Sequence, residues 1–139
     1  MKIPGFETGR ARLRAAVHDT HGAATIEAVI WLPAFFAIFA LIADTSTIFG
    51  SESQVLRVIQ DANRNLSTGY MTTTAQVKAE IMSRISGISP HAVVTTNVVD
   101  NLITTSVVMP LTDITSTGIV GAFTSGHVTV SAEHVMEQE

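Results

Sequence analysis

The sequence predicts an α+β chain with a long N-terminal helix, a short second helix and a small antiparallel sheet of about three strands. Three observations lead to this prediction. An apolar run fills residues 23–43, and apolar residues at helical spacing continue beyond it to about Leu66. After Pro90 the chain changes to β-branched residues in short segments separated by turn residues. Helical patterns therefore come first and strand patterns follow.

Composition favours a membrane segment over a wholly soluble chain. Hydrophobic residues make up 46% of the 139 residues and charged residues only 14%. The net charge is −4 although the first residues are basic, so the remainder is clearly acidic. Because there is no basic stripe outside these first residues, nucleic-acid binding is not expected. The absence of cysteine excludes disulfides, thiolate metal sites and cysteine nucleophiles.

The first part of the chain divides into a polar leader and a candidate transmembrane helix. Residues 1–22 are polar, basic and punctuated by glycine, which suits a cytoplasmic leader. Residues 23–43 contain a single ionisable residue, Glu27. As a helix rising about 1.5 Å per residue, this run spans roughly 31 Å, close to the roughly 30 Å of a bilayer's hydrocarbon core. Pro33 lies inside the run, where it removes a backbone hydrogen bond and is expected to kink the helix.

The basic residues set the expected orientation of this span. The first cation after it is Arg57, whereas four cations precede it: Lys2, Arg10, Arg12 and Arg14. The positive-inside rule therefore places the N-terminus in the cytoplasm and the residues after about 44 outside. In a bacterium this means an inner-membrane protein whose C-terminal part lies in the periplasm or beyond, where incorporation into an extracellular pilus stays open.

Beyond the span, residues 44–69 are predicted to continue as a periplasmic helix extension. Five apolar residues recur at spacings of seven, four, three and four, forming one stripe: Ile48, Val55, Ile59, Ala62 and Leu66. Gly50 weakens this helix and Glu52 falls on the stripe, so a break near 50–52 stays open as an alternative. The residues at 67–69, Ser-Thr-Gly, are expected to end it.

The last part, residues 70–139, is predicted to be a small α+β periplasmic domain. A second helix fits residues 74–86, because Thr73 and Gln76 have the spacing of a capping box and Gly87 with Pro90 follows as a stop. Three residues of this helix share one face: Val77, Ile81 and Ile85.

Three strands are expected after this helix. Residues 92–99 and 102–109 are rich in valine and threonine and flank Asp100 and Asn101, which suit a tight hairpin turn. Residues 127–135 alternate apolar and polar side chains and predict the third strand. The segment 110–126 is rich in threonine, serine and glycine and reads as a long connection with a small apolar cluster, formed by Ile119, Val120 and Phe123.

The junction between leader and span carries the most informative motif. Residues 21–27 read His-Gly-Ala-Ala-Thr-Ile-Glu and lead directly into the apolar run. This resembles the class III signal of type IV prepilins, in which a dedicated aspartic prepilin peptidase cuts after the glycine. The resemblance implies cleavage between Gly22 and Ala23 and places Glu27 as the fifth residue of the mature chain. A glycine suits the cleavage site because it offers no side chain to clash with the protease.

The more specific resemblance is to the TadE-like family of minor pseudopilins, which belong to the tight-adherence (Flp-type IV) pilus system and have a pilin-like fold. The resemblance rests on three features: the Gly-Ala-Ala-Thr-Ile-Glu-Ala sequence at 22–28, Leu32 and Pro33 within the span, and the terminal strand pattern at 128–132. The resemblance implies that Glu27 pairs with the new α-amino group of a neighbouring subunit during assembly, because a membrane carboxylate needs a partner. Implied partners are prepilin peptidase, other pilin or pseudopilin subunits, the inner-membrane assembly platform and membrane lipid.

Simpler interpretations of these residues stay open. Glu27 also fits a tolerated acid near the membrane boundary that reaches toward water, and Gly22 also fits a linker glycine before a signal anchor. A conventional secretory signal ending at Ala43 is a further alternative, although Leu41 is a poor match at its −3 position.

The expected function is structural, that of a minor pseudopilin that takes part in pilus assembly. Two alternatives remain: a signal-anchored periplasmic binding or adhesin module that is not processed, and a major pilus subunit. Enzymatic activity is not expected because the sequence has no P-loop, dinucleotide fingerprint or nucleophile-elbow motif. The five histidines lack zinc-ligand spacing outside the leader, so neither a metal nor a cofactor is expected.

Overall fold

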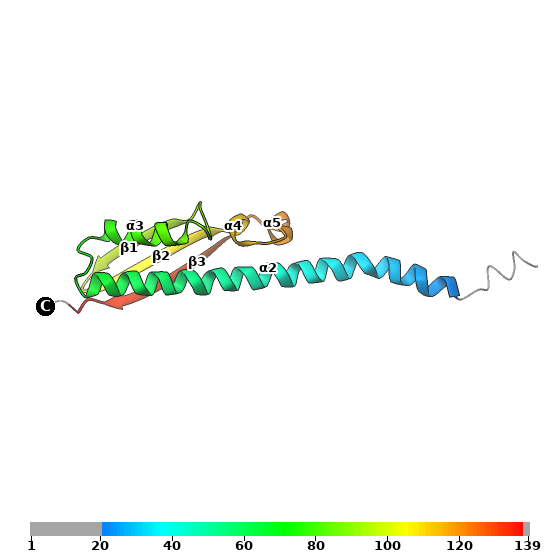
Figure 1. The fold of residues 1–139 in the computed structure, drawn as a ribbon, viewed down its shortest axis with the longest axis horizontal. Coiled ribbons are helices and arrows are strands. Elements are labelled where there is room, and N and C mark those ends of the chain that lie inside the picture. Colours follow the sequence, from blue (N-terminus) through cyan, green and yellow to red (C-terminus); the bar gives the residue numbers. More distant parts are fainter. Residues whose placement is uncertain (1–20, 138–139) are drawn as a thin grey trace, which may run out of the picture. The chain divides into compact units, whose positions relative to one another are not determined.

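The computed structural model describes residues 21–137 and the side chains from residue 25 onward (Figure 1). Its elements, in chain order, are α2 (His21–Ser67), α3 (Thr74–Ile85), β1 (Val93–Val99), β2 (Leu102–Pro110), α4 (Leu111–Ile114), α5 (Ile119–Phe123) and β3 (His127–Val135). The predicted α+β class is confirmed. The chain divides into two compact units, Met1–Ile38 and Phe39–Glu139, and α2 contributes residues to both.

Helix α2 runs without interruption through both Pro33 and Gly50. The break considered near 50–52 does not occur. Glycine costs a helix about 1 kcal/mol relative to alanine, but the helix on both sides of Gly50 is held by packing, because Ile48 and Val55 belong to the core cluster or contact it. A Cβ at position 50 would meet nothing within 4 Å, so this glycine is not required by a close approach.

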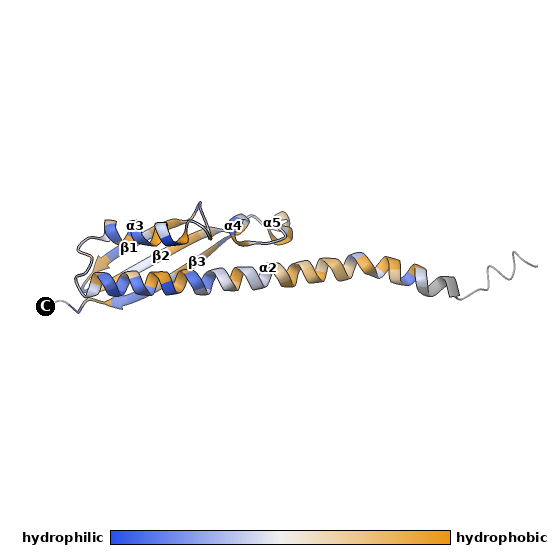
Figure 2. Cartoon of the chain, viewed as in Figure 1, coloured by the Kyte–Doolittle hydropathy of each residue, from blue (hydrophilic) through white to orange (hydrophobic). Residues whose placement is uncertain are grey.

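The second half of α2 buries the predicted apolar stripe. Val55, Ile59 and Ala62 are fully buried, Leu66 is nearly so, and Ile48 is partly buried against them. Figure 2 shows that the N-terminal part of α2 is mostly hydrophobic, whereas its C-terminal part alternates hydrophobic and hydrophilic residues. A helix that is apolar all round suits a membrane or a large core, and an amphipathic one suits the surface of a small domain.

Helix α3 begins with the capping box that the sequence predicts. The Thr73 hydroxyl accepts from the backbone N–H of Gln76, and the Gln76 side chain accepts from the backbone N–H of Thr73. This exchange satisfies two donors that a helix start leaves unpaired. The helix ends at Ile85, one residue before the predicted end, and buries its expected face: Val77, Ile81 and Ile85.

The sheet has the order β1-β2-β3 and is antiparallel throughout. The β1–β2 hairpin turns at Asp100 and Asn101, whose φ angles are 50° and 63°. Two successive residues with positive φ form the type I′ turn, whose twist matches that of the strands. The central strand β2 alternates buried and half-buried residues, and its buried side chains join the core: Ile103, Thr105, Val107 and Met109.

A buried polar cluster lies between α2 and the sheet. The Thr105 hydroxyl donates to Oδ1 of Asn63 at 2.6 Å and lies 3.1 Å from the Thr96 hydroxyl. Asn63 Nδ2 donates to the carbonyl of Ala132 on β3 at 3.2 Å. One side chain of α2 therefore reaches strands β2 and β3 at once, so the polar cluster specifies how this helix sits on the sheet.

The long connection expected between the second and third strands contains two short helices that the sequence analysis did not predict, α4 and α5. Ile114, in α4, is the residue of this connection whose side chain is buried in the core. The residues of the apolar cluster noted in the sequence lie partly or largely at the surface: Ile119 and Val120 are half-buried, and Phe123 is 87% exposed. The sequence pattern detected apolar residues but not their surroundings, since those depend on how the connection folds back on α2.

Candidate assembly site on the N-terminal helix

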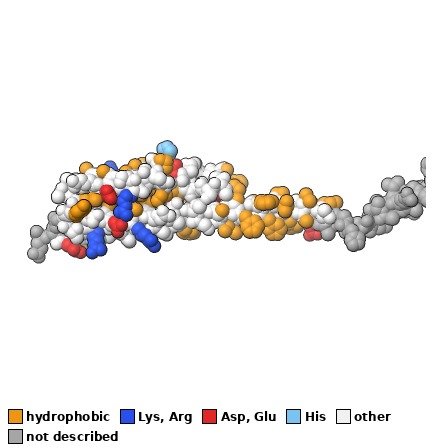
Figure 3. Space-filling model, viewed as in Figure 1, with side chains coloured by type: hydrophobic (Ala, Val, Ile, Leu, Met, Phe, Trp, Pro, Cys, Tyr) orange, Lys and Arg blue, Asp and Glu red, His pale blue; other side chains and the backbone are white. Residues whose placement is uncertain are grey.

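The unit Met1–Ile38 presents the candidate span as a bare helix. Eight large apolar side chains between residues 26 and 38 are each more than half exposed, namely Ile26, Val29, Ile30, Trp31, Leu32, Phe35, Phe36 and Ile38. Figure 3 shows this hydrophobic surface along the helix. Within the described residues, one helix is long and apolar enough to cross a membrane, with a mean hydropathy of 2.3 over an 18-residue window that is 0% buried. Leaving so much apolar surface in water is unfavourable, so this segment requires lipid or a protein partner.

The predicted cleavage residues Gly22 and Ala23 lie in the first turn of α2. Residues 1–20 of the predicted leader lie outside the described part of the chain. Helix ends fray readily, so a peptide bond in the first turn is more easily extended for a protease than one farther along the helix.

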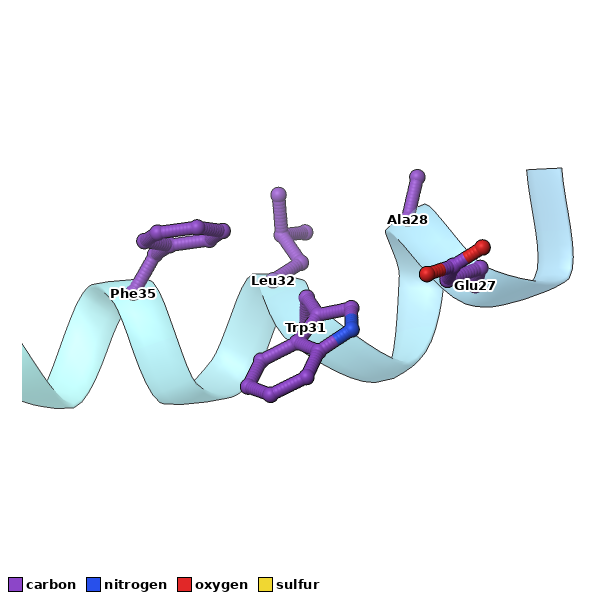
Figure 4. Close-up of a pocket in the computed structure, with 5 residues that line it drawn as sticks. All are labelled: Glu27, Ala28, Trp31, Leu32 and Phe35. Carbon is purple, nitrogen blue, oxygen red and sulfur yellow. The ribbon is translucent and has the colours of Figure 1, made fainter. Parts of the chain in front are cut away.

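Glu27 lies one turn beyond these residues, on a face shared with apolar side chains. Figure 4 shows Glu27, Ala28, Trp31, Leu32 and Phe35, which together line an open depression on the helix surface. Residues 27, 31 and 35 follow the i, i+4 spacing that stacks side chains along one face. No hydrogen bond or ion pair to Glu27 is found among residues 25–137. The structure thus brings an acid and an aromatic face together on a helix surface open to another molecule.

Pro33 lies within α2, six residues beyond Glu27. Having no N–H, it leaves the Val29 carbonyl without its usual intrahelical donor. The helix continues on both sides of this position.

The structure also reveals a buried carboxylate that the sequence reasoning missed. Asp44, the first residue after the predicted span, is fully buried in the unit Phe39–Glu139. Its two oxygens accept from the backbone N–H of Thr117 at 2.6 Å and of Val120 at 3.1 Å. Burial opposes ionisation, but these backbone donors outweigh it and hold the pKa of Asp44 below its ordinary value. Val120 lies in the first turn of α5, so Asp44 acts as an N-cap supplied by another helix.

A second carboxylate, Asp113, joins α4 to the segment before β1. It accepts from the Ser89 hydroxyl at 2.7 Å and from the His91 backbone N–H at 3.0 Å. Nδ1 of His91 lies 3.1 Å from its other oxygen. Burial raises the pKa of Asp113, but the Ser89 and His91 contacts outweigh burial and leave the pKa lowered. These contacts hold the segment before β1 against α4. The sequence did not predict them, because its only signal is an acid in the first turn of a four-residue helix.

The comparison with protein-family models decides which family α2 resembles. The model described as TadE-like protein matches residues 22–64. The N-terminal helix is TadE-like. This match confirms the resemblance inferred from residues 22–28 and from Leu32 and Pro33, and it does not extend to the strand pattern at 128–132. No curated protein and no solved structure matches the chain.

The TadE-like region begins at Gly22 and ends three residues before α2 does. It therefore contains the junction, Glu27, the candidate span and most of the buried stripe that contacts the sheet. The strands and α3 lie outside it. The resemblance is thus carried by the anchor helix rather than by the domain that packs on it.

Proposed function

We propose that this chain is a minor pseudopilin that is processed by prepilin peptidase and takes part in assembling a tight-adherence pilus. The observation that carries the proposal is the coincidence of three features on one helix. The TadE-like match starts at Gly22, Glu27 follows five residues later, and the helix surface beyond it is apolar and exposed. The role is structural, and it calls for no catalytic residue, metal or cofactor.

In this proposal the chain crosses the bacterial inner membrane once, with its N-terminus in the cytoplasm. Residues 1–22 are the leader, 23–43 the transmembrane helix, 44–69 its periplasmic extension and 70–139 the remainder of the periplasmic part. The exposed apolar surface between residues 26 and 42 supports the span. The four cations before residue 21 support the orientation.

Processing changes the electrostatics of the helix start. Cleavage after Gly22 removes the four leader cations and creates an α-amino group at Ala23. Glu27 then offers a carboxylate on an apolar face, where a neighbouring subunit's amino group is a suitable partner because a charge in lipid is costly when unpaired. A cut at one bond thereby prepares both halves of an intersubunit ion pair.

The two halves of α2 have different tasks in this proposal. The second half is committed to its own domain through Val55, Ile59 and Ala62. The first half keeps its apolar surface, including Trp31 and Phe35, for lipid and then for helices of neighbouring pilin or pseudopilin subunits. A kink at Pro33 would let this half adapt to its neighbours without disturbing the sheet.

The test is the mature N-terminus of the membrane-derived protein. We expect intact mass and N-terminal sequencing to show a chain starting at Ala23 when prepilin peptidase is co-expressed, and the full-length chain without the enzyme. Gly22→Leu should stay full length. Gly50→Ala is the matched control, since position 50 has room for a Cβ and lies far from the cut, and it should be processed normally. A chain that keeps its leader under every condition would replace the pseudopilin proposal with the unprocessed, signal-anchored module.

A further inference from the structure

The connection between β2 and β3 leaves three apolar side chains partly or largely exposed. These side chains belong to the five-residue helix α5: Ile119, Val120 and Phe123. Phe123 is 87% exposed. Between Asp113 and His127 the sequence contains no ionisable residue. A solvent-facing loop of a soluble domain normally carries charges or hides its aromatic residues, so this surface calls for an occupant.

Asp44 determines which turn of α2 lies beside this apolar surface. Its hydrogen bonds to Thr117 and Val120 hold the start of α5 beside the helix turn at residue 44. That turn directly follows the candidate span, and the neighbouring side chains Phe39, Leu41 and Ile42 are exposed. Within the unit Phe39–Glu139, Figure 1 shows α5 at the end at which α2 enters the unit. The exposed face of α5 and the exposed turn of α2 therefore lie at one level.

Three polar side chains of α2 near this level, those of Asp44, Thr45 and Thr47, have hydrogen-bond partners within the protein. Asp44 is the only ionisable residue between Glu27 and Glu52, and its carboxylate is covered by backbone donors. The Thr45 and Thr47 hydroxyls donate to the carbonyls of Leu41 and Ala43 one turn earlier. Masking of this kind suits a helix turn that borders the hydrocarbon core, because hydrocarbon offers no partners for polar groups.

We propose that α5 is an interfacial membrane anchor, with Ile119, Val120 and Phe123 seated at the boundary between lipid headgroups and acyl chains. An apolar face buried about 5 to 10 Å into this boundary is the usual mode of a monotopic element. Together with the span it gives the domain two attachments to the membrane and restricts its rotation about α2. The inference depends on the proposed membrane span, and the test below separates the two.

The test uses single-tryptophan variants of the full chain in phosphatidylcholine vesicles whose acyl chains are brominated either near the glycerol backbone or near their middle. Trp31→Phe combined with Phe123→Trp reports on α5. Trp31→Phe combined with Tyr70→Trp is the matched control, because Tyr70 is 83% exposed. It also lies beyond the far end of α2, roughly 35 Å of helix from Asp44. The native Trp31 reports on the span itself.

We expect the tryptophan at 123 to emit at shorter wavelength than the one at 70, and to lose most of its fluorescence with the shallow bromine label. The probe at 70 should stay unquenched, and Trp31 should be quenched by the deep label. Equal, unquenched emission at 123 and 70 overturns the anchor while leaving the span intact. Alternatively, the tryptophan at 123 emits at short wavelength, is not quenched by bromine, and shifts further as the protein-to-lipid ratio increases. This result assigns the surface to a contact with a second copy of the chain and also overturns the anchor. If Trp31 is not quenched, the proposed membrane span is wrong, and the anchor proposal falls with it.

Discussion

The carboxylate of Asp44 accepts the backbone N–H of Val120, 76 residues later in the chain, at 3.1 Å. With the Thr117 bond at 2.6 Å, it holds the β2–β3 connection against α2 at the point where the candidate span ends. A fully buried acid is rare unless its oxygens are satisfied, and here two backbone donors satisfy it. The pair thus fixes α5 relative to the helix that enters the membrane in our proposal.

Replacing Asp44 should release this connection. In Asp44→Ala the N–H groups of Thr117 and Val120 lose their acceptor, so we expect much faster hydrogen exchange at these two amides and little change at the amides of β2. Glu52→Ala is the control on the same helix, since the side chain is half-buried and shows no hydrogen bond among the described residues. Unchanged exchange at 117 and 120 would contradict a holding role for Asp44.

The same carboxylate predicts a pH dependence. Its pKa in the folded state lies below the ordinary value of 3.8, so the stabilisation is complete above that value and is lost as the pH falls through the lower, folded-state pKa. In an acid titration followed by NMR, the amide signals of Thr117 and Val120 should move together below about pH 4. Asp44→Asn should abolish that transition. A transition near neutral pH would show that the carboxylate is not held in its charged form.

Removing the centre of the buried polar cluster should destabilise the domain more than a surface change on the same helix. Asn63→Ala removes the acceptor of the Thr105 hydroxyl and the side-chain donor to the Ala132 carbonyl, and losing the partner of a buried polar group costs about 1 to 3 kcal/mol. Asn65→Ala removes a half-buried side chain and should stay within about 0.5 kcal/mol. Denaturant unfolding of the chain in detergent micelles measures both, and equal losses would argue against the cluster.

The two carboxylates of the domain's ion pairs should differ in importance. Asp113→Ala should lower the unfolding midpoint clearly, because three contacts from Ser89 and His91 converge on an almost buried side chain. Asp61→Ala breaks only its exposed pair with Arg84, at 3.3 Å, and should cost about 0 to 1 kcal/mol. The same unfolding measurement compares them. A larger loss for Asp61→Ala would reverse the ranking.

Glu27→Gln should separate processing from assembly. Because the peptidase in our proposal reads the glycine and not the acid, we expect normal cleavage at Gly22 but loss of most of the protein from the sheared pilus fraction. Cells lacking the wild-type copy provide the background, and Glu52→Gln is the control acid outside the span. Immunoblots of membrane and pilus fractions give the result. Normal incorporation of the Glu27→Gln protein would leave the acid as a tolerated boundary residue.

Several elements of the fold could be predicted because their signals are local. The Thr73 and Gln76 exchange, the turn at Asp100 and Asn101, and the alternation in β3 each depend on residues a few positions apart. The apolar stripe of α2 was found for the same reason, since a helix repeats every few residues. The break considered at Gly50 illustrates the limit: the helix continues there because Ile48 and Val55, on either side of it, pack in or against the core, and that packing cannot be seen in the helix sequence.

By itself the sequence determined the apolar span, the junction from Gly22 to Glu27, and the identity of each main helix and strand. These properties follow from composition and short periodicities, which act before the chain is packed. Only the tertiary structure decided that Asp44 holds the connection 73 and 76 residues away, that Asn63 joins α2 to two strands, and that Phe123 faces outward. Such contacts depend on where the chain closes its long loops, and a polar or apolar residue takes its role from the partners it meets there.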